Sequence, residues 1–485
     1  MRSHRIGFAA FSLIVSAFPA PAQNDDYHRC HEYALSNPDL ALNYCSAAIQ
    51  SGHLSGKQLA GTFVNRGIAH SIKGDYDQAI QDYDQAIRLA PDNALAFTSR
   101  GVAFYSKDDY DRAIEDYEQA IRLKPDDPGA FINRGNALSD KGNYDRAIQD
   151  FDQAIRLNPG IAEAFNGRGV ALNGKGDYNR AIHDFDQAIR LKPRSAAAFF
   201  GRGIAFRHEG DYDRAIQDFD QAIRFEPDDA DAFIGRGNAV IDKGNYDRAI
   251  QDFDQAIRLQ PHNAIAFINR GGAFRHKGDY NLAIQDFDQA IRFKPDFAEA
   301  FFGRGVAYRQ EGDYARAIQD FDQAIRLKPD DARVFTSRGV AEFCLHRFSM
   351  ARKDLARAGE LNPKYYYNPI WLYVTDVRAG QQSNVVLKEQ TAPFDLTNWP
   401  GPVIKFLLGA STQEALLAAA TNQVQKKDRE QHCEAYFFLG ESALVEGDRQ
   451  RALNWFRKTV ETGVTNYLEY SAAQAELKYL TSDQQ

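Results

Sequence analysis

The sequence has few of the residues that build metal and redox sites. Of its 485 residues, four are cysteine, two are methionine and three are tryptophan. The eleven histidines follow no metal-ligand spacing, and no glycine-rich phosphate loop, zinc-type helix motif or nucleophile elbow is present. Because a catalytic site needs convergent acid, base or nucleophile residues, these absences argue against an enzyme. We expect no catalytic residue, no metal and no cofactor.

Positive charge and long apolar runs are also scarce. Lysine and arginine number 58 against 66 aspartates and glutamates, which gives a formal net charge of −8 at pH 7. Nucleic acids are bound mainly through their phosphates, so an acidic chain is a poor general nucleic-acid binder, and we expect no nucleic-acid partner. After residue 22, no apolar run reaches the length of a membrane-spanning helix.

What the chain does contain is a repeat of 34 residues. One copy, residues 94–127, predicts a helix, a tight turn, a second helix and a proline that stops the second helix. A fixed period of this length is typical of a solenoid, in which each repeat packs only against its neighbours. The recurring prolines are Pro91, Pro125, Pro159, Pro193, Pro227, Pro261, Pro295, Pro329 and Pro363.

Small and aromatic residues share one face of each predicted helix. Phe97, Gly101 and Phe104 are spaced by four and three residues, and alanine, tyrosine and alanine follow at the same spacing in the second helix. The small residues allow the helix backbones to approach closely while the aromatic rings fill the space around them. In most repeats the turn reads Gly-Asp-Tyr, as at residues 210–212, where aspartate caps the next helix. The residues to which we assign structural roles are Gly101, Ala113, Ala120 and Pro125.

This pattern of aromatic, glycine, aromatic, alanine, aromatic, alanine and proline resembles the tetratricopeptide repeat (TPR) family. Nine consecutive repeats, counted from Ala60, cover residues 60–365. The ninth is degenerate, with His346, Phe348 and Leu355 in place of glycine, tyrosine and the usual aromatic residue. The resemblance implies an all-α fold, a right-handed superhelical solenoid of helix hairpins. It also implies that the first helix of each repeat lines a concave groove that binds other proteins or peptides.

The start of the chain differs from the repeats. Residues 1–22 are typical of a secretory signal peptide, with two arginines, an apolar run over residues 6–18 and a small-residue cleavage site. We therefore expect cleavage before Gln23 and a periplasmic or secreted protein without a transmembrane segment. The alternative is an uncleaved membrane anchor, for which the apolar run is short. Residues 23–59 predict an N-terminal helical cap that covers the apolar face of the first repeat.

The four cysteines fall into two groups. Export favours a disulfide bond between Cys30 and Cys45 near the start of the solenoid. The alternative is two buried thiols. The sequence assigns no partner to Cys344 in the last repeat or to Cys433 in the tail.

After Pro363 the composition changes, and all three tryptophans lie in this tail. We expect residues 366–485 to form an irregular helical cap that contains a TPR-like hairpin at about residues 433–466. This tail, with its aromatic helix at residues 436–440, resembles the NlpI family of periplasmic TPR lipoproteins. That family links cell-wall hydrolases to a periplasmic protease. The present chain has no lipid-anchor cysteine and a longer array, so neither anchoring nor the same partners is carried over.

The TPR resemblance implies which side chains face the groove: positions 2, 5, 6, 9, 12 and 13 of each first helix, which we call the groove-facing positions. Arginines at position 12 favour binding of acidic side chains or a carboxylate, and the alternative is a solvated charged stripe. Apolar residues at position 5 and asparagines at position 9 favour an amphipathic or extended segment, and the alternative is packing between repeats. The candidate groove residues are Arg207, His208, Arg275, His276, Arg309, Phe200, Phe302, Asn136 and Asn238.

Position 7 is arginine in every repeat, where the family usually has leucine. It is not a groove-facing position, and buried charges need partners. We therefore predict a structural role, in which the head of an arginine such as Arg202 points toward second-helix aspartates such as Asp218 or Asp252.

The sequence thus predicts a non-enzymatic scaffold or adaptor in the bacterial periplasm that binds peptide segments or proteins in its groove. The tail suggests a link to envelope proteases or peptidoglycan hydrolases. Two alternatives remain open: a structural component of an envelope polysaccharide or secretion assembly, and an enzyme whose active site lies in the tail.

Overall fold

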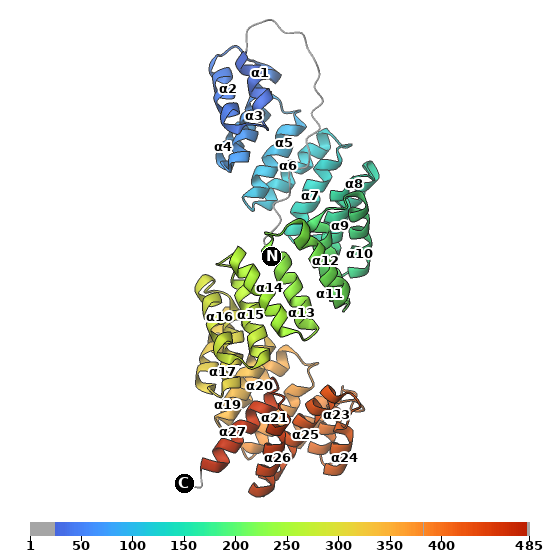
Figure 1. Cartoon of the computed structure of the whole chain (residues 1–485), viewed down its shortest axis with the longest axis vertical. Coiled ribbons are helices and arrows are strands. Elements are labelled where there is room, and N and C mark those ends of the chain that lie inside the picture. Colours follow the sequence, from blue (N-terminus) through green and yellow to red (C-terminus); the bar gives the residue numbers. More distant parts are fainter. Residues whose placement is uncertain (1–24, 382, 483–485) are drawn as a thin grey trace. The chain divides into compact units, whose positions relative to one another are not determined.

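A computed structural model describes residues 25–381 and 383–482 of the chain. The predicted signal peptide, residues 1–22, lies outside the described residues. Within them all regular structure is helical, with helices α1 to α27 and no strand (Figure 1). The predicted all-α fold is confirmed. The chain divides into two compact units, Met1–Ala239 and Val240–Gln485.

The first unit consists of a short helical start followed by helix pairs. Cys30 in α1 and Cys45 in α2 form a disulfide bond, and α2 packs against α3 of the first pair. The helices are α1 (Asp25–Tyr33), α2 (Pro38–Gln50), α3 (Gly56–Lys73), α4 (Tyr76–Leu89), α5 (Ala94–Ser106), α6 (Tyr110–Leu123), α7 (Pro128–Asp140), α8 (Tyr144–Leu157), α9 (Ala162–Lys175), α10 (Tyr178–Leu191), α11 (Ala196–His208), α12 (Tyr212–Phe225) and α13 (Ala230–Asp242), in which the unit boundary falls.

The second unit continues the pairs and ends in a larger helical region. Its paired helices are α14 (Tyr246–Leu259), α15 (Ala264–Lys277), α16 (Tyr280–Phe293), α17 (Ala298–Glu311), α18 (Tyr314–Leu327), α19 (Ala332–Cys344) and α20 (Phe348–Leu361). The C-terminal region contains α21 (Tyr367–Arg378), α22 (Asn384–Thr391), α23 (Gly401–Leu407), α24 (Gln413–Ala420), α25 (Gln425–Val445), α26 (Arg449–Glu461) and α27 (Leu468–Ser482). No helix in the described part of the chain is long and apolar enough to cross a membrane.

A contact between glycine and an aromatic ring closes the hairpins of the repeats, except in the ninth, where Gly339 faces Leu355. A β-carbon built on Gly101 of α5 would lie 2.7 Å from Cε1 of Tyr117 in α6, so only glycine fits there. Ala113 and Ala120 are fully buried on the same face of α6, and Pro125 lies exposed in the turn that follows. The close approach that the sequence predicts is therefore made by the backbone of one helix against the ring of the other.

The position-7 arginines form a ladder of ion pairs, which confirms their predicted structural role. Arg202 donates from Nε and Nη2 to the two carboxylate oxygens of Asp218, each at 2.7 Å. Its Nη1 donates to Asp186 in the preceding hairpin. The same pattern recurs in the second unit, where Arg304 holds Asp320 and reaches back to the preceding hairpin. Arginines such as Arg202 and Arg304 thus tie their own hairpin together and join it to the one before.

The ladder ends where the repeats end. Arg338 holds Asp354 of its own hairpin and Asp322 of the preceding one. In earlier repeats, the acid that pairs with the arginine of the following repeat stands two residues after the aspartate that pairs within the hairpin. The ninth repeat has Ala356 at this position. No arginine follows that would need this acid, because Leu372 stands at the corresponding place in α21.

The C-terminal region shares one core with the last repeats. This core includes Trp371 of α21, Phe437 of α25 and Phe456 of α26, all fully buried. A β-carbon on Gly440 would collide with the Phe456 ring, so α25 and α26 make the same glycine–aromatic contact as the repeats. Helix α27 packs against α26, α25 and α19. The end of the chain therefore folds back onto the ninth repeat.

Candidate functional site

In the first unit, the predicted groove residues lie on the first helices α7, α11 and α13. His208 is exposed, and its ring stacks on Tyr178 of the preceding repeat with a centroid distance of 4.6 Å. Arg207, Asn136 and Asn238 are half-buried. Tyr178 starts α10, so the end of one first helix rests on the start of the preceding second helix.

The apolar position-5 residues are packed to different degrees. Ile132 and Ile234 are each only 7% exposed, so at these repeats position 5 belongs to the core. Phe200 is half-buried, with its ring 5.7 Å from that of Phe219. In the second unit, Phe302 is half-buried and the guanidinium of Arg333 lies 5.3 Å from its ring centre. These contacts support the packing alternative for position 5.

In both units, a side chain at position 12 forms a hydrogen bond with the next repeat. In the first unit, Nδ2 of Asn173 donates to the carbonyl oxygen of Gly201 at 2.9 Å. In the second, Nη1 of Arg275 donates to Oε1 of Gln310 at 3.4 Å. Side chains at this position therefore bridge neighbouring first helices.

His276 follows Arg275 and stacks on Tyr246, as His208 stacks on Tyr178. Burial, aided by the charge of Arg275, lowers the pKa of His276 to about 4. Its ring is neutral at neutral pH. Burial and the charge of Arg309 lower the pKa of Arg275 to about 10, so this guanidinium stays protonated. Of the adjacent pair in α15, only the arginine is charged.

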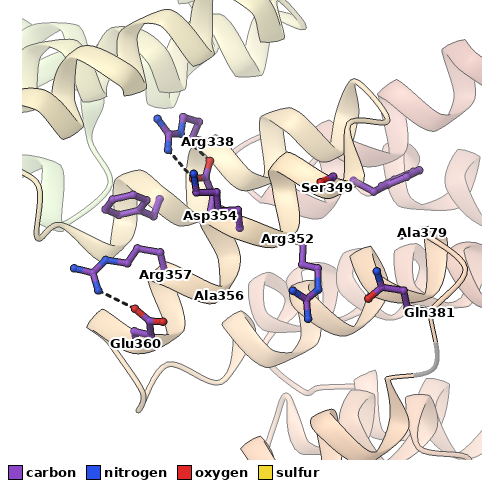
Figure 2. Close-up of a pocket in the computed structure, with 12 residues that line it drawn as sticks. Arg338, Ser349, Arg352, Asp354, Ala356, Arg357, Glu360, Ala379 and Gln381 are labelled. Carbon is purple, nitrogen blue, oxygen red and sulfur yellow. Dashed lines mark hydrogen bonds and ion pairs between the residues drawn. The ribbon is translucent and has the colours of Figure 1, made fainter.

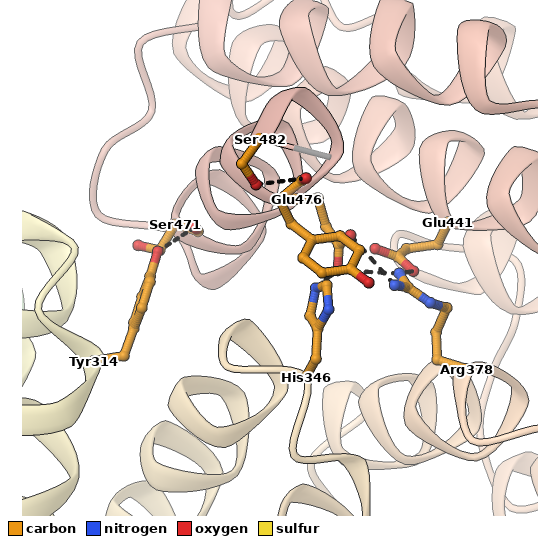
Figure 3. Close-up of polar contacts among 8 residues, drawn as sticks. Tyr314, His346, Arg378, Glu441, Ser471, Glu476 and Ser482 are labelled. Carbon is orange, nitrogen blue, oxygen red and sulfur yellow. Dashed lines mark hydrogen bonds and ion pairs between the residues drawn. The ribbon is translucent and has the colours of Figure 1, made fainter. Parts of the chain in front are cut away.

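Arg309 differs from the open groove position that the sequence predicts. It is only 3% exposed, and its Nη1 donates to Oγ of Ser471 in α27 at 2.8 Å. Its neighbour Gln310 donates to the carbonyl oxygen of Thr465 at 3.0 Å. The hydroxyl of Tyr314 donates to the backbone carbonyl oxygen of Ser471 at 2.8 Å (Figure 3). The tail folds back over this part of the repeat, and a 34-residue pattern carries no information about such a contact.

Beside this contact, α27 meets a buried cluster of acidic and basic side chains (Figure 3). Arg378 of α21 donates to Glu441 at 2.7 Å and to Glu476 of α27 at 3.1 Å. Nε2 of His346 lies 3.0 Å from Oε1 of Glu476. Burial raises the pKa of Glu441 to about 8, and the charge of Arg378 acts against this rise. The cluster fixes α27 against α21, α25 and the turn between α19 and α20.

A second acidic pair is held by aromatic donors. Oε2 of Glu434 accepts from the indole of Trp399 at 2.9 Å, and Oε1 of Glu469 accepts from the indole of Trp371 at 3.2 Å. Burial, together with the charge of Glu469, raises the pKa of Glu434 well above its ordinary value. Burial raises the pKa of Glu469 to about 7. The 34-residue repeat pattern does not identify these residues, although glutamates seven residues apart in α25 and in α27 were a signal that each pair shares a helix face.

A hollow of about 780 Å³ lies beside α20 (Figure 2). Arg352, at its edge, donates to Asp376 at 2.8 Å, and Arg357 donates to Glu360 at 2.8 Å. Since Arg338 also holds Asp354, each of these guanidiniums has a carboxylate partner within the protein. In the described part of the chain, no group of histidine, cysteine, aspartate and glutamate side chains is arranged to hold a metal ion.

Consecutive helix pairs, closed by glycine–aromatic contacts and joined by a repeating ion-pair ladder, define an α-helical repeat protein. The chain belongs to the tetratricopeptide repeat family. One profile described as tetratricopeptide repeat matches residues 65–128, 174–230, 234–296 and 278–332, and a second of the same description matches residues 128–160. Proteins of this family are generally non-enzymatic scaffolds that bind other proteins or peptides.

Solved structures of other repeat proteins are similar to the chain. A tetratricopeptide repeat protein from Parabacteroides merdae is 22% identical over 48% of this chain and 93% of its own, with a TM-score of 0.42. The APC/C hetero-tetramer Cut9-Hcn1 is 16% identical over 72% of this chain and 83% of its own, with a TM-score of 0.47. The type IV pilus biogenesis factor PilW is 21% identical over 43% of this chain and 97% of its own, with a TM-score of 0.41. The family assignment rests on the profile matches and on the repeat itself. Because these matches end at residue 332, the resemblance of the tail to the NlpI lipoproteins stays a prediction.

Proposed function

We propose that this protein is a non-enzymatic adaptor of the bacterial periplasm that binds a segment of another protein at the groove-facing positions of its repeats. The observation that carries the proposal is the contact between the eighth repeat and α27. There, the groove-facing Arg309 and Gln310 hold a segment of the chain itself through Ser471 and Thr465. Side chains that hold an internal segment in this way are suited to hold a segment of a partner.

Two features support the export part of the proposal. Residues 1–22 have the pattern of a secretory signal peptide. Cys30 and Cys45 are joined by a disulfide bond, and disulfides persist mainly in oxidising compartments outside the cytosol.

The partners that we propose are envelope proteases or peptidoglycan hydrolases, in keeping with the resemblance of the tail to the NlpI family. The acidic chain, with a net charge of −8, makes nucleic acid a poor partner. A structural role in an envelope polysaccharide or secretion assembly is the alternative, and it would appear as a stable membrane complex that co-purifies with the protein.

Affinity capture from envelope extract of the source organism tests this function. The full chain is compared with an Arg207→Glu/Arg275→Glu variant, which reverses charge at two groove-facing positions. We expect the wild-type chain to enrich a protease or wall hydrolase and the variant to lose it.

The matched control is Arg190→Glu/Arg292→Glu, which makes the same charge change at exposed positions of the second helices α10 and α16. This control should retain the partner. Equal capture by all three proteins would place binding away from the groove-facing arginines, and an absence of any enriched protein would contradict the adaptor function.

A further inference from the structure

Two arginines of the second unit lack the carboxylate partners that the ladder arginines have. Within the described residues, no aspartate or glutamate forms an ion pair with Arg275 or Arg309. Arg275 contacts an amide oxygen of Gln310 at 3.4 Å, and its Nη2 lies 3.0 Å from Nε2 of His276. Arg309 contacts the hydroxyl of Ser471, and its Nε is buried without a hydrogen-bond partner. Both occupy position 12 of their repeats.

This arrangement concentrates positive charge where water is partly excluded. Arg309 is 3% exposed, and Arg275 is half-buried. A third cation, Lys426 at the start of α25, acts on the neighbouring His276 ring. Glu469 is the acid whose charge acts on Arg309, and its carboxylate already accepts from Trp371. Buried charge without a counter-ion is unfavourable, so an anion that arrives here offsets an existing electrostatic penalty.

The donors present favour one kind of anion. A guanidinium has a planar set of N–H donors that pairs with a carboxylate through two hydrogen bonds. Arg275 is the member of the pair that remains partly open to solvent, whereas α27 covers Arg309. The phenol groups of Tyr246 and Tyr280 raise the pKa of Arg275, against the lowering by burial and by the charge of Arg309.

We propose that Arg275 binds a carboxylate of the partner segment, with Gln310 beside it and the charge of Arg309 strengthening the attraction. This inference rests on the proposed function, because it names the chemical group that the groove-facing surface selects. The carboxylate comes either from an aspartate or glutamate side chain or from the carboxyl end of the partner chain.

Fluorescence anisotropy with three labelled hexapeptides separates these sources. The first alternates glycine and glutamate and has a blocked carboxyl end. The second alternates glycine and glutamine with the same blocked end, and the third has the second sequence with a free carboxyl end. We expect the full chain to bind the first or the third at least tenfold more tightly than the second, with an affinity that falls as salt is added.

Variants assign this binding to Arg275. Arg275→Gln should weaken binding of the preferred peptide about tenfold, and Arg292→Gln, on the exposed face of α16, should leave it unchanged. Arg275→Lys keeps the charge and loses the planar pair of donors, so it should weaken binding less than Arg275→Gln. If Arg275→Gln does not fold, Arg275→Lys serves as the test in its place. Binding of the preferred peptide by Arg275→Lys as tightly as by the wild type would then contradict the assignment of the site to Arg275.

Three results would overturn the carboxylate inference: equal binding of all three peptides, no binding of any peptide, or unchanged binding by Arg275→Gln. None of them contradicts the adaptor function, which depends on capture of the whole partner. If the chain captures no partner but still binds the preferred peptide, the adaptor function is contradicted and the carboxylate inference stands.

Discussion

At the scale of single residues, the position-7 arginine replaces the leucine that is usual in this family with a charge that must be compensated. Arg100 meets two carboxylates, Asp116 in its own hairpin and Asp84 in the preceding one. Burial raises the pKa of Asp116, and the hydrogen bonds from Arg100 act against this rise. The ring of Phe97 lies 5.7 Å from the guanidinium carbon. Removal of one partner leaves the other buried without compensation, which is more destabilising than removal of both.

A double-mutant cycle tests this compensation between the arginine and its aspartate. Arg202→Leu should lower the free energy of unfolding by about 3–5 kcal/mol, because Asp218 then stays buried without its partner. Arg202→Leu/Asp218→Leu should recover most of that loss. Chemical denaturation of the full chain measures both variants. A double variant no more stable than Arg202→Leu alone would contradict the ladder as we describe it.

Two glycine-to-alanine substitutions with different expected effects on stability test the contact that closes the hairpin. Gly101→Ala should destabilise the protein by about 1–3 kcal/mol, since the new methyl group would lie 2.7 Å from the Tyr117 ring. The control is Gly272→Ala in α15, where a β-carbon meets nothing within 4 Å. There the substitution should be neutral or stabilise by up to about 1 kcal/mol, because alanine favours the helix. Thermal unfolding of both variants provides the comparison, and equal effects would contradict a tight contact at Gly101.

At the scale of secondary-structure elements, α27 acts as the cover of the last repeats. Its contacts are polar as well as apolar: Ser471 accepts from Arg309, and Glu476 lies between Arg378 and His346. The four buried glutamates of α25 and α27 make this region sensitive to the protonation state of its carboxyl groups.

The direction of the pH dependence follows from the raised pKa values of Glu469, about 7, and Glu441, about 8. An ordinary glutamate has a pKa of about 4.3. Between about pH 4.3 and its raised pKa, each of these carboxyl groups therefore holds a proton in the folded chain that it has released in the unfolded chain. This contribution to stability is full below about pH 4.3 and is lost as the pH rises through 7 and 8. The second unit should therefore unfold at a lower temperature at pH 8.5 than at pH 5.5.

Glu469→Gln isolates one of these groups. Its amide oxygen can still accept from the Trp371 indole, but the side chain carries no charge at any pH. We expect a melting temperature a few degrees above that of the wild type at pH 8.5, and a smaller difference at pH 5.5. The exposed substitution Glu414→Gln in α24 is the control and should follow the wild type at both pH values. An identical pH dependence in wild type and Glu469→Gln would contradict a raised pKa at this residue.

At the scale of the whole molecule, the repeats make stability a local property. Each helix pair contacts mainly its immediate neighbours along the chain. In such an array a destabilising substitution weakens its own repeat and the adjacent ones and leaves distant repeats unaffected.

Hydrogen exchange of the Gly101→Ala variant tests this locality. Amides of α5, α6 and the helices next to them should exchange faster than in the wild type, whereas amides of α25 to α27 should be unchanged. Mass spectrometry of peptic peptides resolves the two regions. Uniformly faster exchange along the chain would mean that the chain unfolds as one cooperative body.

The 34-residue period by itself determined the helix pairs, the glycine–aromatic contacts and the direction of arginines such as Arg202 toward Asp218. These features depend on residues within one repeat or in the next, so spacing along the chain specifies them. Only the tertiary structure decided that α27 covers Arg309, that the pKa of His276 falls to about 4 and that Arg275 lacks an internal carboxylate. The physical reason is that burial and partner choice at these side chains depend on segments that the repeat does not encode, above all the non-repetitive tail.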